Sequence, residues 1–209
     1  PHLAATFDAD DMSGKQSCRE ALAAECGWPS DADPIIGMVT RLTDQKGVDI
    51  ALGMLRYLPT LPGRLVVLGA GDKRLAAELS AAAAADPERV AFREGYDDAF
   101  GHRIFAGSDL FLMPSRFEPC GLAQMQAMAY GTIPVVTDVG GLHDTVCDDD
   151  HQRGEGTGFV SCTVDREGLI DALHRAVRAL RQPPRRKAIQ RRGMTRDWSW
   201  RAPAEEHLR

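Results

Sequence analysis

Two cationic side chains follow the first apolar run of the chain. Arg41 and Lys46 lie in the segment 40–47, directly after residues 35–39, whose apolar character is typical of a buried strand. Arginine presents a planar fork of donors and lysine a compact point charge, and the free N–H groups of a helix start add to the positive field. The pattern therefore predicts a phosphate site. The alternative is that both are ordinary solvated surface charges.

A carboxylate and a glycine-containing turn stand together in the segment 114–122. Glu118 precedes a Pro-Cys-Gly turn, and its oxygens can accept hydrogen bonds from sugar hydroxyls. Because the turn opens a predicted helix, the backbone N–H groups of Cys120, Gly121 and Leu122 would face a phosphate there. The segment therefore predicts a place for a sugar phosphate. The alternative is that Glu118 is a helix-start charge that only complements the dipole.

Further candidates follow other predicted strands. Tyr96, after Gly95, can stack on a base with its ring while its hydroxyl stays in water, although a partly buried core tyrosine is an equal alternative. Gly140 and Gly141 allow a backbone to approach a ligand closely, and a plain turn is the competing interpretation. Cys120 is interpreted as a packing residue instead of a nucleophile, because no histidine or asparagine is evidently arranged as its base.

Several remaining motifs favour structural roles. The Gly69-Ala70-Gly71-Asp72 segment lacks the third glycine of a dinucleotide fingerprint and is interpreted as a tight turn with a helix cap. The six histidines show no metal-type spacing. Two of them, His102 and His143, are possible cleft residues, with a structural or surface role favoured for each. The basic segments 185–187 and 191–192 are interpreted as the solvated face of a helix.

These side chains need a scaffold that brings strand ends together. Apolar runs alternate with stretches of helical spacing, which implies a parallel sheet covered by helices on both faces, a doubly wound α/β domain. In such sheets ligands lie beyond the carboxyl ends of the strands, where the candidate segments fall. The predicted strands are residues 35–39, 64–68, 90–93, 110–113, 133–136 and 159–160, and the predicted helices are 47–58, 73–85, 99–106, 122–129 and 142–147.

The flanks of this alternation are helical. Residues 1–30 form a leading segment with an interdomain helix over 13–26, capped by Ser13 and ended by Gly27. Residues 31–182 form the Rossmann-like domain, and its last helix begins after residue 165. Residues 183–209 form C-terminal helices after a break at two prolines, with a last helix after Trp200.

Composition sets outer limits on function. The 209 residues carry a formal net charge of −5, which gives no global attraction for nucleic acid. There is no apolar run that would span a bilayer and no signal-like start, so we expect a cytoplasmic protein without a membrane partner. Five scattered cysteines indicate reduced thiols. The chain begins without Met and stops within a helix-like pattern, so we expect a piece of a longer protein.

Taken together, the motifs resemble bacterial glycogen synthases and plant starch synthases in order and spacing. The Phe-Glu-Pro-Cys-Gly-Leu string is highly specific to that family, whereas Glu-Pro-x-Gly-Leu also occurs in other retaining nucleotide-sugar transferases. The resemblance spans nearly the whole chain. It rests on Arg41-Leu42-Thr43-Asp44-Gln45-Lys46-Gly47, Leu68-Gly69-Ala70-Gly71-Asp72, Pro114-Ser115-Arg116-Phe117-Glu118-Pro119-Cys120-Gly121-Leu122, Tyr130-Gly131-Thr132-Ile133-Pro134, Gly140-Gly141-Leu142 and Asp197-Trp198-Ser199-Trp200.

This resemblance implies the second domain of a GT-B glycosyltransferase, in which two Rossmann-like domains face each other across a cleft. It implies a glucosyl transfer from ADP-glucose to an α-1,4-glucan with retention of configuration and without a metal or other cofactor. By the same resemblance, Arg41 and Lys46 meet the diphosphate and Glu118 holds the glucose hydroxyls. The remaining donor-binding residues would be Gly95, Tyr96, Cys120, Gly121, Leu122, Gly140 and Gly141. The first domain, absent from these residues, would supply the rest of the site.

Two positions depart from relatives, and two other readings stay open. Ala123 replaces a threonine common after Gly-Leu, and Gln126 stands where other retaining transferases have glutamate. A UDP-glucose-dependent enzyme of the sucrose or trehalose-phosphate type is the first alternative. A stand-alone, non-catalytic nucleotide- or glucan-binding module is the second.

Overall fold

The central sheet has six parallel strands in the order β3-β2-β1-β4-β5-β6. The computed structural model describes residues 2–30, 33–57 and 60–198. All six predicted strands are present. They are β1 (Ile35–Leu42), β2 (Arg64–Gly71), β3 (Val90–Glu94), β4 (Leu110–Met113), β5 (Ile133–Thr137) and β6 (Phe159–Ser161). The strand order reverses between β1 and β4, so their carboxyl ends flank the switch point where open α/β sheets bind ligands.

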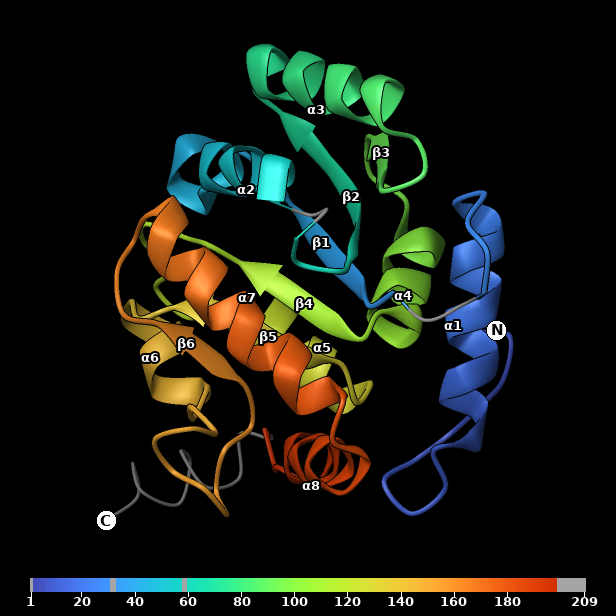
Figure 1. The fold of residues 1–209 in the computed structure, drawn as a ribbon, viewed down its shortest axis with the longest axis vertical. Helices are drawn as coiled ribbons and strands as arrows, with labels where there is room; N and C mark the ends of the chain where they lie inside the picture. The colour runs from blue at the N-terminus through green and yellow to red at the C-terminus, as the bar shows by residue number, and fades with distance from the viewer. Residues whose placement is uncertain (1, 31–32, 58–59, 199–209) are drawn as a thin grey trace, which may run out of the picture.

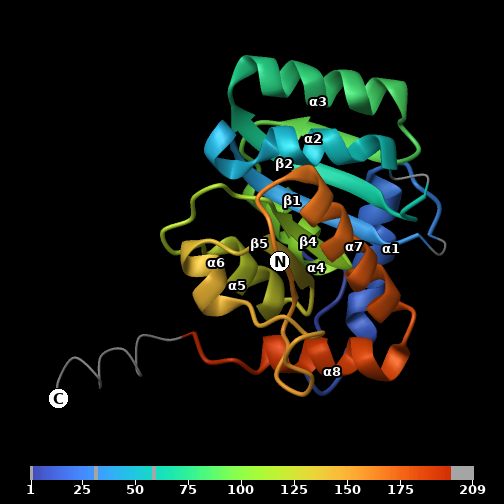
Figure 2. The same ribbon diagram turned by 60° about the vertical axis from the view of Figure 1, so that its left-hand side comes forward.

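Helices cover both faces of this sheet (Figures 1 and 2). One apolar cluster packs α2, α3 and α7 on the sheet, and a second packs α1, α4, α5 and α6 on the other face. The predicted doubly wound architecture is therefore confirmed. The helices are α1 (Ser13–Glu25), α2 (Val48–Met54), α3 (Lys73–Ala85), α4 (Asp98–Gly107), α5 (Ala123–Ala129), α6 (Gly140–Thr145), α7 (Arg166–Leu180) and α8 (Pro183–Met194), with short 3-10 turns η1 (Asp44–Lys46) and η2 (Leu55–Tyr57).

The first two strands are longer than the sequence pattern predicts. Arg41 pairs in register with Ala70, so it lies on the end of β1 and not in a loop. Glycines make this pairing possible, because a Cβ on Gly69 would lie 2.3 Å from the carbonyl oxygen of Thr40. The predicted tight turn at this point is thus wrong. The predicted cap is confirmed, since the Asp72 side chain accepts from the first backbone N–H groups of α3.

Several helix ends differ from the prediction. Ser13 is the first residue of α1 and not its cap, and its N–H donates to the Asp11 carboxylate at 3.0 Å. Gly27 follows the helix with φ +74°, the left-handed conformation expected of a terminating glycine. The helix α6 starts at Gly140, two residues earlier than predicted. The predicted helix after Trp200 lies outside the described residues.

The basic face of α8 is only partly solvated, which corrects its interpretation. Asp149, only 3% exposed, accepts from Arg185 at 2.7 Å and from Arg192 at 2.6 Å. The neighbouring Asp148 pairs with Arg175 of α7 at 2.8 Å. These buried carboxylates require such partners, so the segment 146–158 is tied to α7 and α8 by ion pairs. None of the helices in the described part of the chain combines the length and apolar character needed to cross a membrane.

Candidate functional site

The structure brings two of the predicted site residues into direct contact. Lys46 follows β1 and Glu118 follows β4, and their Nζ and Oε2 atoms are 2.6 Å apart. Glu118 is 5% exposed and also accepts from the Ser115 hydroxyl at 3.3 Å. Its second oxygen, Oε1, forms no hydrogen bond with a described residue and is not shut off from solvent. One buried carboxylate therefore holds a cation and keeps an acceptor for a ligand.

Arg41 stands beside this pair without a partner. It is exposed, and no described residue forms an ion pair or hydrogen bond with its guanidinium. Arg41 lines a cavity of about 180 Å³ together with Lys46, Ser115, Glu118 and Gly121. The site thus offers one committed and one free cation around a single carboxylate, an arrangement suited to a ligand that carries both phosphate and hydroxyl groups.

A second, wider cavity of about 410 Å³ adjoins the first, and Arg41, Leu122 and Ala123 line both. Tyr96 lines the wider one and is 90% exposed, so the alternative of a partly buried core tyrosine is wrong. Gly95 precedes it with φ +125°. This cavity is the more apolar part of the cleft, and its exposed ring is available for stacking on a planar group.

The two histidines considered as cleft residues, His102 and His143, line different cavities. His102 lines the wider cavity and its Nδ1 lies 2.9 Å from the Tyr130 hydroxyl. His143 lies elsewhere, 2.6 Å from Asp138, in a different cavity of about 680 Å³. The hydrogen bond to Asp138 raises the pKa of His143 above its usual value. Of these two histidines, only His102 therefore lines the cleft. Among the described residues, no group of three His, Cys, Asp or Glu side chains is arranged to hold a metal ion.

Gly140 and Gly141, at the start of α6, lie against the backbone of the segment 118–120. The Gly141 N–H donates to the Glu118 carbonyl at 2.8 Å. A Cβ on Gly141 would lie 1.9 Å from the Cys120 carbonyl oxygen, and one on Gly140 would lie 2.2 Å from that of Glu118. Neither glycine lines the two cavities. The structure therefore gives them a packing role, in which α6 presses against the segment 118–120, while direct ligand contact stays a prediction.

The glycine turn before α5 is held by a residue that the sequence analysis missed. Gly121 has φ +73°, and the fully buried Gln124 donates from Nε2 to its carbonyl at 2.8 Å. A Cβ on Gly121 would lie 2.5 Å from the Gln124 Oε1 atom. Cys120 is exposed and lines neither cavity, which leaves its thiol outside the cleft. Leu122 is 68% exposed at the cleft mouth.

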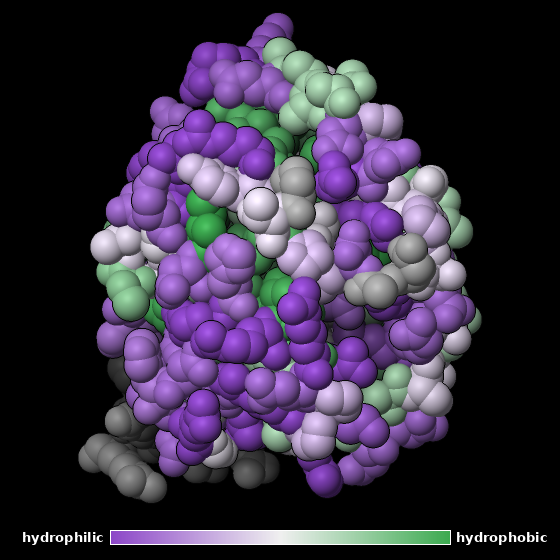
Figure 3. Space-filling view, viewed as in Figure 1, coloured by the Kyte–Doolittle hydropathy of each residue, from purple (hydrophilic) through white to green (hydrophobic). Residues whose placement is uncertain are grey.

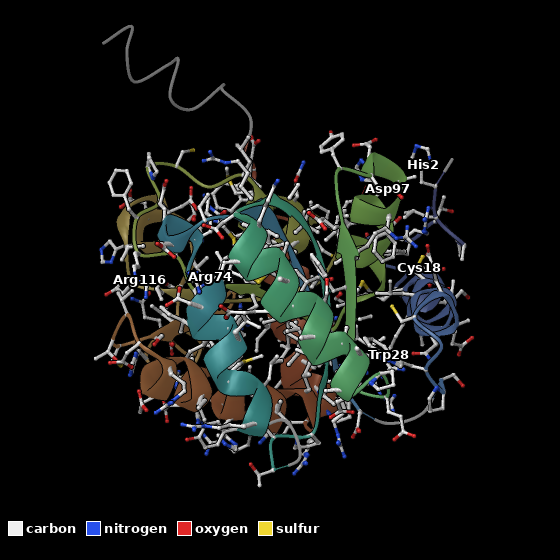
Figure 4. The ribbon with its side chains drawn as sticks, turned by 90° about the horizontal axis from the view of Figure 1, so that it is seen from above. His2, Cys18, Trp28, Arg74, Asp97 and Arg116 are labelled. Atoms are coloured by element: carbon white, nitrogen blue, oxygen red, sulfur yellow. The ribbon has the colours of Figure 1, made fainter. Side chains whose placement is uncertain are left out.

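An ion pair outside the cavities fixes the two charged segments relative to each other. Arg116 donates to the Asp49 carboxylate with both terminal nitrogens at 2.7 Å, and these bonds lower the pKa of Asp49 below its usual value. The backbone N–H of Arg116 donates to the Gln45 carbonyl at 2.8 Å. Gly47 permits this approach, because a Cβ there would lie 1.8 Å from the Pro114 carbonyl oxygen. Figure 4 shows Arg116 on the side of α2, away from α1.

Comparison with known proteins gives one consistent group of relatives. Residues 27–195 match the family described as glycosyl transferases group 1. The chain is 45% identical over 211 aligned residues to a glycogen synthase of Nitrosospira multiformis, covering 99% of this chain and 42% of that protein. The chain therefore spans less than half the length of this curated relative.

Two solved structures share the fold. The catalytic domain of starch synthase IV from Arabidopsis thaliana, bound to ADP and acarbose, superposes with a TM-score of 0.92 at 35% identity, covering 100% of this chain and 44% of that one. A sucrose-phosphate synthase from Thermosynechococcus elongatus superposes with a TM-score of 0.66 at 25% identity, covering 90% and 46%.

Proposed function

Because the chain belongs to the group 1 glycosyl transferases, we propose that it is the nucleotide-sugar-binding half of a glycogen or starch synthase that uses ADP-glucose. The proposal is supported by the 45% identity to a protein named glycogen synthase and by the superposition on a starch synthase domain bound to ADP. The curated relative is more than twice as long, so a further domain would face this cleft and complete a GT-B enzyme.

One observation carries the proposal, namely the grouping of Arg41, Lys46 and Glu118 around one cavity at the switch point of the sheet. In the proposed complex the diphosphate meets Arg41 and Lys46, and the glucose hydroxyls donate to Glu118. The backbone of residues 120–122 lies beside the phosphate and sugar. The adenine occupies the wider cavity next to Tyr96.

Transfer in this proposal depends on stabilising the leaving group. As the bond between glucose C1 and the diphosphate breaks, negative charge grows on the departing ADP, and the two cations are already placed beside it. Lys46 then exchanges part of its contact with Glu118 for a phosphate oxygen. A hydroxyl at the non-reducing end of an α-1,4-glucan attacks C1 from the face that the diphosphate leaves and gives its proton to the departing diphosphate, so the configuration is retained. We propose that no metal ion or resident cofactor takes part, and that the whole enzyme is cytoplasmic.

Calorimetric titration of this chain with ADP, ADP-glucose, UDP and UDP-glucose tests the proposal. We expect adenine-selective binding, and a loss of at least about tenfold in affinity in both Arg41→Ala and Lys46→Ala, because each removes a charge-assisted bond to phosphate. Arg153→Ala is the matched control, since Arg153 is exposed, lines neither donor cavity and forms no ion pair with a described residue.

The remaining outcomes separate the alternatives. Uridine preference would move the assignment to the alternative of a UDP-glucose-dependent enzyme of the sucrose or trehalose-phosphate type. Equal binding by wild type and both variants would contradict the placement of the diphosphate. Binding of a glucan with no nucleotide affinity would favour a non-catalytic glucan-binding module.

A further inference from the structure

Arg186 is a half-buried cation with no anionic partner. Its neighbour on α8, Arg185, donates to two carboxylates at 2.7 Å, whereas no described residue forms an ion pair or hydrogen bond with the Arg186 side chain. A guanidinium removed from part of its water and left unpaired is unfavourable compared with a paired one. An anion bound beside the Arg186 guanidinium would therefore be favourable.

This guanidinium lies in a groove at the opposite ends of the strands from the donor cleft. Two adjoining cavities of about 600 Å³ each share Gln16, Arg19, Asp109 and Arg186 in their walls. Asp109 directly precedes β4, and Pro34, also in the wall, directly precedes β1. The groove thus lies at the amino ends of the strands, between α1, α7 and α8, and is separate from the site at their carboxyl ends. Figure 3 shows hydrophilic residues over the surface between α8 and α1.

The positive charge of the groove exceeds its available negative charge. The side chains of Arg181 and Lys187 also line it, and neither side chain forms an ion pair or hydrogen bond with a described residue. Lys15 lines the same groove; burial is the main cause that lowers its pKa, and the nearby charge of Arg186 acts in the same direction. At least three cations at this surface are therefore not neutralised within the described part of the chain.

Three of the four carboxylates around the groove are held by close bonds, and the fourth, Asp33, lies 4.0 Å from Arg64. Asp109 accepts from Arg19 at 3.0 Å and from the Ile35 N–H at 2.9 Å. Asp10 pairs with Arg191 at 3.1 Å, and Asp11 accepts from a backbone N–H at the start of α1. These bonds hold the acidic groups in place and leave Arg186 as the free donor facing the cavity.

We propose that this groove binds a small phosphate-bearing anion, with the planar fork of Arg186 on the phosphate and Arg181 and Lys187 as supporting charges. Arginine suits such an ion because its parallel N–H donors match two phosphate oxygens. The cavity extends past the guanidinium toward Pro34, Pro62, Val177 and Leu180, which gives room for an organic group. A phosphate monoester is therefore expected to bind more tightly than free phosphate. This inference does not depend on the proposed synthase activity.

Titration of the 209-residue chain with inorganic phosphate and with glycerol 1-phosphate, followed by amide chemical shifts, tests this site. We expect saturable shifts around residues 16–19, 109 and 181–187, with tighter binding of the ester. Arg186→Gln is expected to weaken both by at least about tenfold, and Arg186→Lys, which keeps the charge but loses the fork, by less. Equal affinity of the two ligands would assign the groove to free phosphate.

Three controls keep the result decisive. Arg153→Gln removes the same charge from an exposed residue that lines neither cavity of the groove, and is expected to leave both affinities unchanged. Arg41→Ala disables the donor cleft and is expected to leave the groove shifts intact. The proposal is wrong if no saturable shifts occur at the groove, if they vanish in Arg41→Ala, or if Arg153→Gln and Arg186→Gln weaken binding equally. Unchanged thermal unfolding of Arg186→Gln shows that its loss of binding is not a loss of fold.

Discussion

Arg116 donates to the carboxylate of Asp49 with both terminal nitrogens, at 2.7 Å each. This ion pair joins the segment that carries Glu118 to α2, the helix that follows Lys46. The two residues are 67 positions apart in the chain. Neither lines the donor cavities. Their pairing fixes the spacing of groups that do, because the backbone of Arg116 is also bonded to Gln45.

We therefore predict that Arg116→Gln weakens ADP-glucose binding, although the residue does not reach the ligand. The expected loss is about three- to tenfold, since the two charged segments can then shift relative to each other. Stability should change by less than about 1 kcal/mol because both side chains remain partly exposed to solvent, 43% for Arg116 and 38% for Asp49. Calorimetry and urea unfolding measure the two effects. Arg89→Gln, which breaks an equally exposed pair with Asp86, is the control, and equal losses in both variants would contradict the prediction.

Glu118→Gln should separate the sugar contact from the phosphate contact. The substitution removes the partner of Lys46 while keeping the side-chain shape, so Lys46 becomes more available to phosphate. We expect ADP affinity to hold or rise, and the advantage of ADP-glucose over ADP to fall by about tenfold. Titrations with both ligands give the ratio, with the exposed Glu78→Gln on α3 as control. A parallel loss for both ligands would mean that Glu118 acts only by placing Lys46.

Gly141→Ala should destabilise the chain by about 1–3 kcal/mol, because the added Cβ would lie 1.9 Å from a backbone oxygen that cannot move without its loop. Gly101→Ala in α4 is the matched control, since its Cβ would meet nothing closer than 3.7 Å. We expect that variant to be as stable as wild type or slightly more stable. Urea unfolding compares them, and equal stability of the two variants would disprove the packing role of Gly141.

Lys15 should make stability rise with pH. Burial lowers its pKa from 10.5 to about 7, while Nζ donates to Ala106, Tyr130 and Thr132. Between these two values the unfolded chain binds a proton that the folded chain has released, so the free energy of unfolding increases as pH rises through this window. The slope approaches about 1.4 kcal/mol per pH unit. The difference between wild type and Lys15→Met in urea unfolding at pH 7.5 and 9.0 isolates this contribution. A constant difference would show that the ammonium stays protonated.

Asp149→Ala should be among the more damaging single changes. It leaves Arg185 and Arg192 without the buried carboxylate that both contact, and removing one partner of a buried pair costs about 3–5 kcal/mol. Asp171→Ala removes a 66% exposed carboxylate from Arg175 and is expected to cost less than about 1 kcal/mol. Thermal unfolding of both variants measures the contrast, and similar values would mean that the buried network adds little.

Local patterns in the sequence were sufficient for the architecture. Apolar runs and helical spacing located all six strands, and parallel strands with intervening helices leave one doubly wound arrangement as the natural solution. The same patterns placed Arg41, Lys46, Glu118 and Tyr96 near strand ends, because each motif is a short, contiguous segment. The extent of β1 was not predictable, since it depends on how closely Gly69 and Gly71 of another strand approach it.

Only the tertiary structure decided which side chains hold one another. Lys46 and Glu118 are 72 residues apart, and the half-buried position of Asp49 on a helix gives no signal that Arg116 would bind it. The division of the α8 cations, with Arg185 and Arg192 paired and Arg186 free, follows from where the segment 146–158 folds back. Periodicity reports which face of an element is apolar, whereas pairings between charges depend on distances that exist only after the elements have packed.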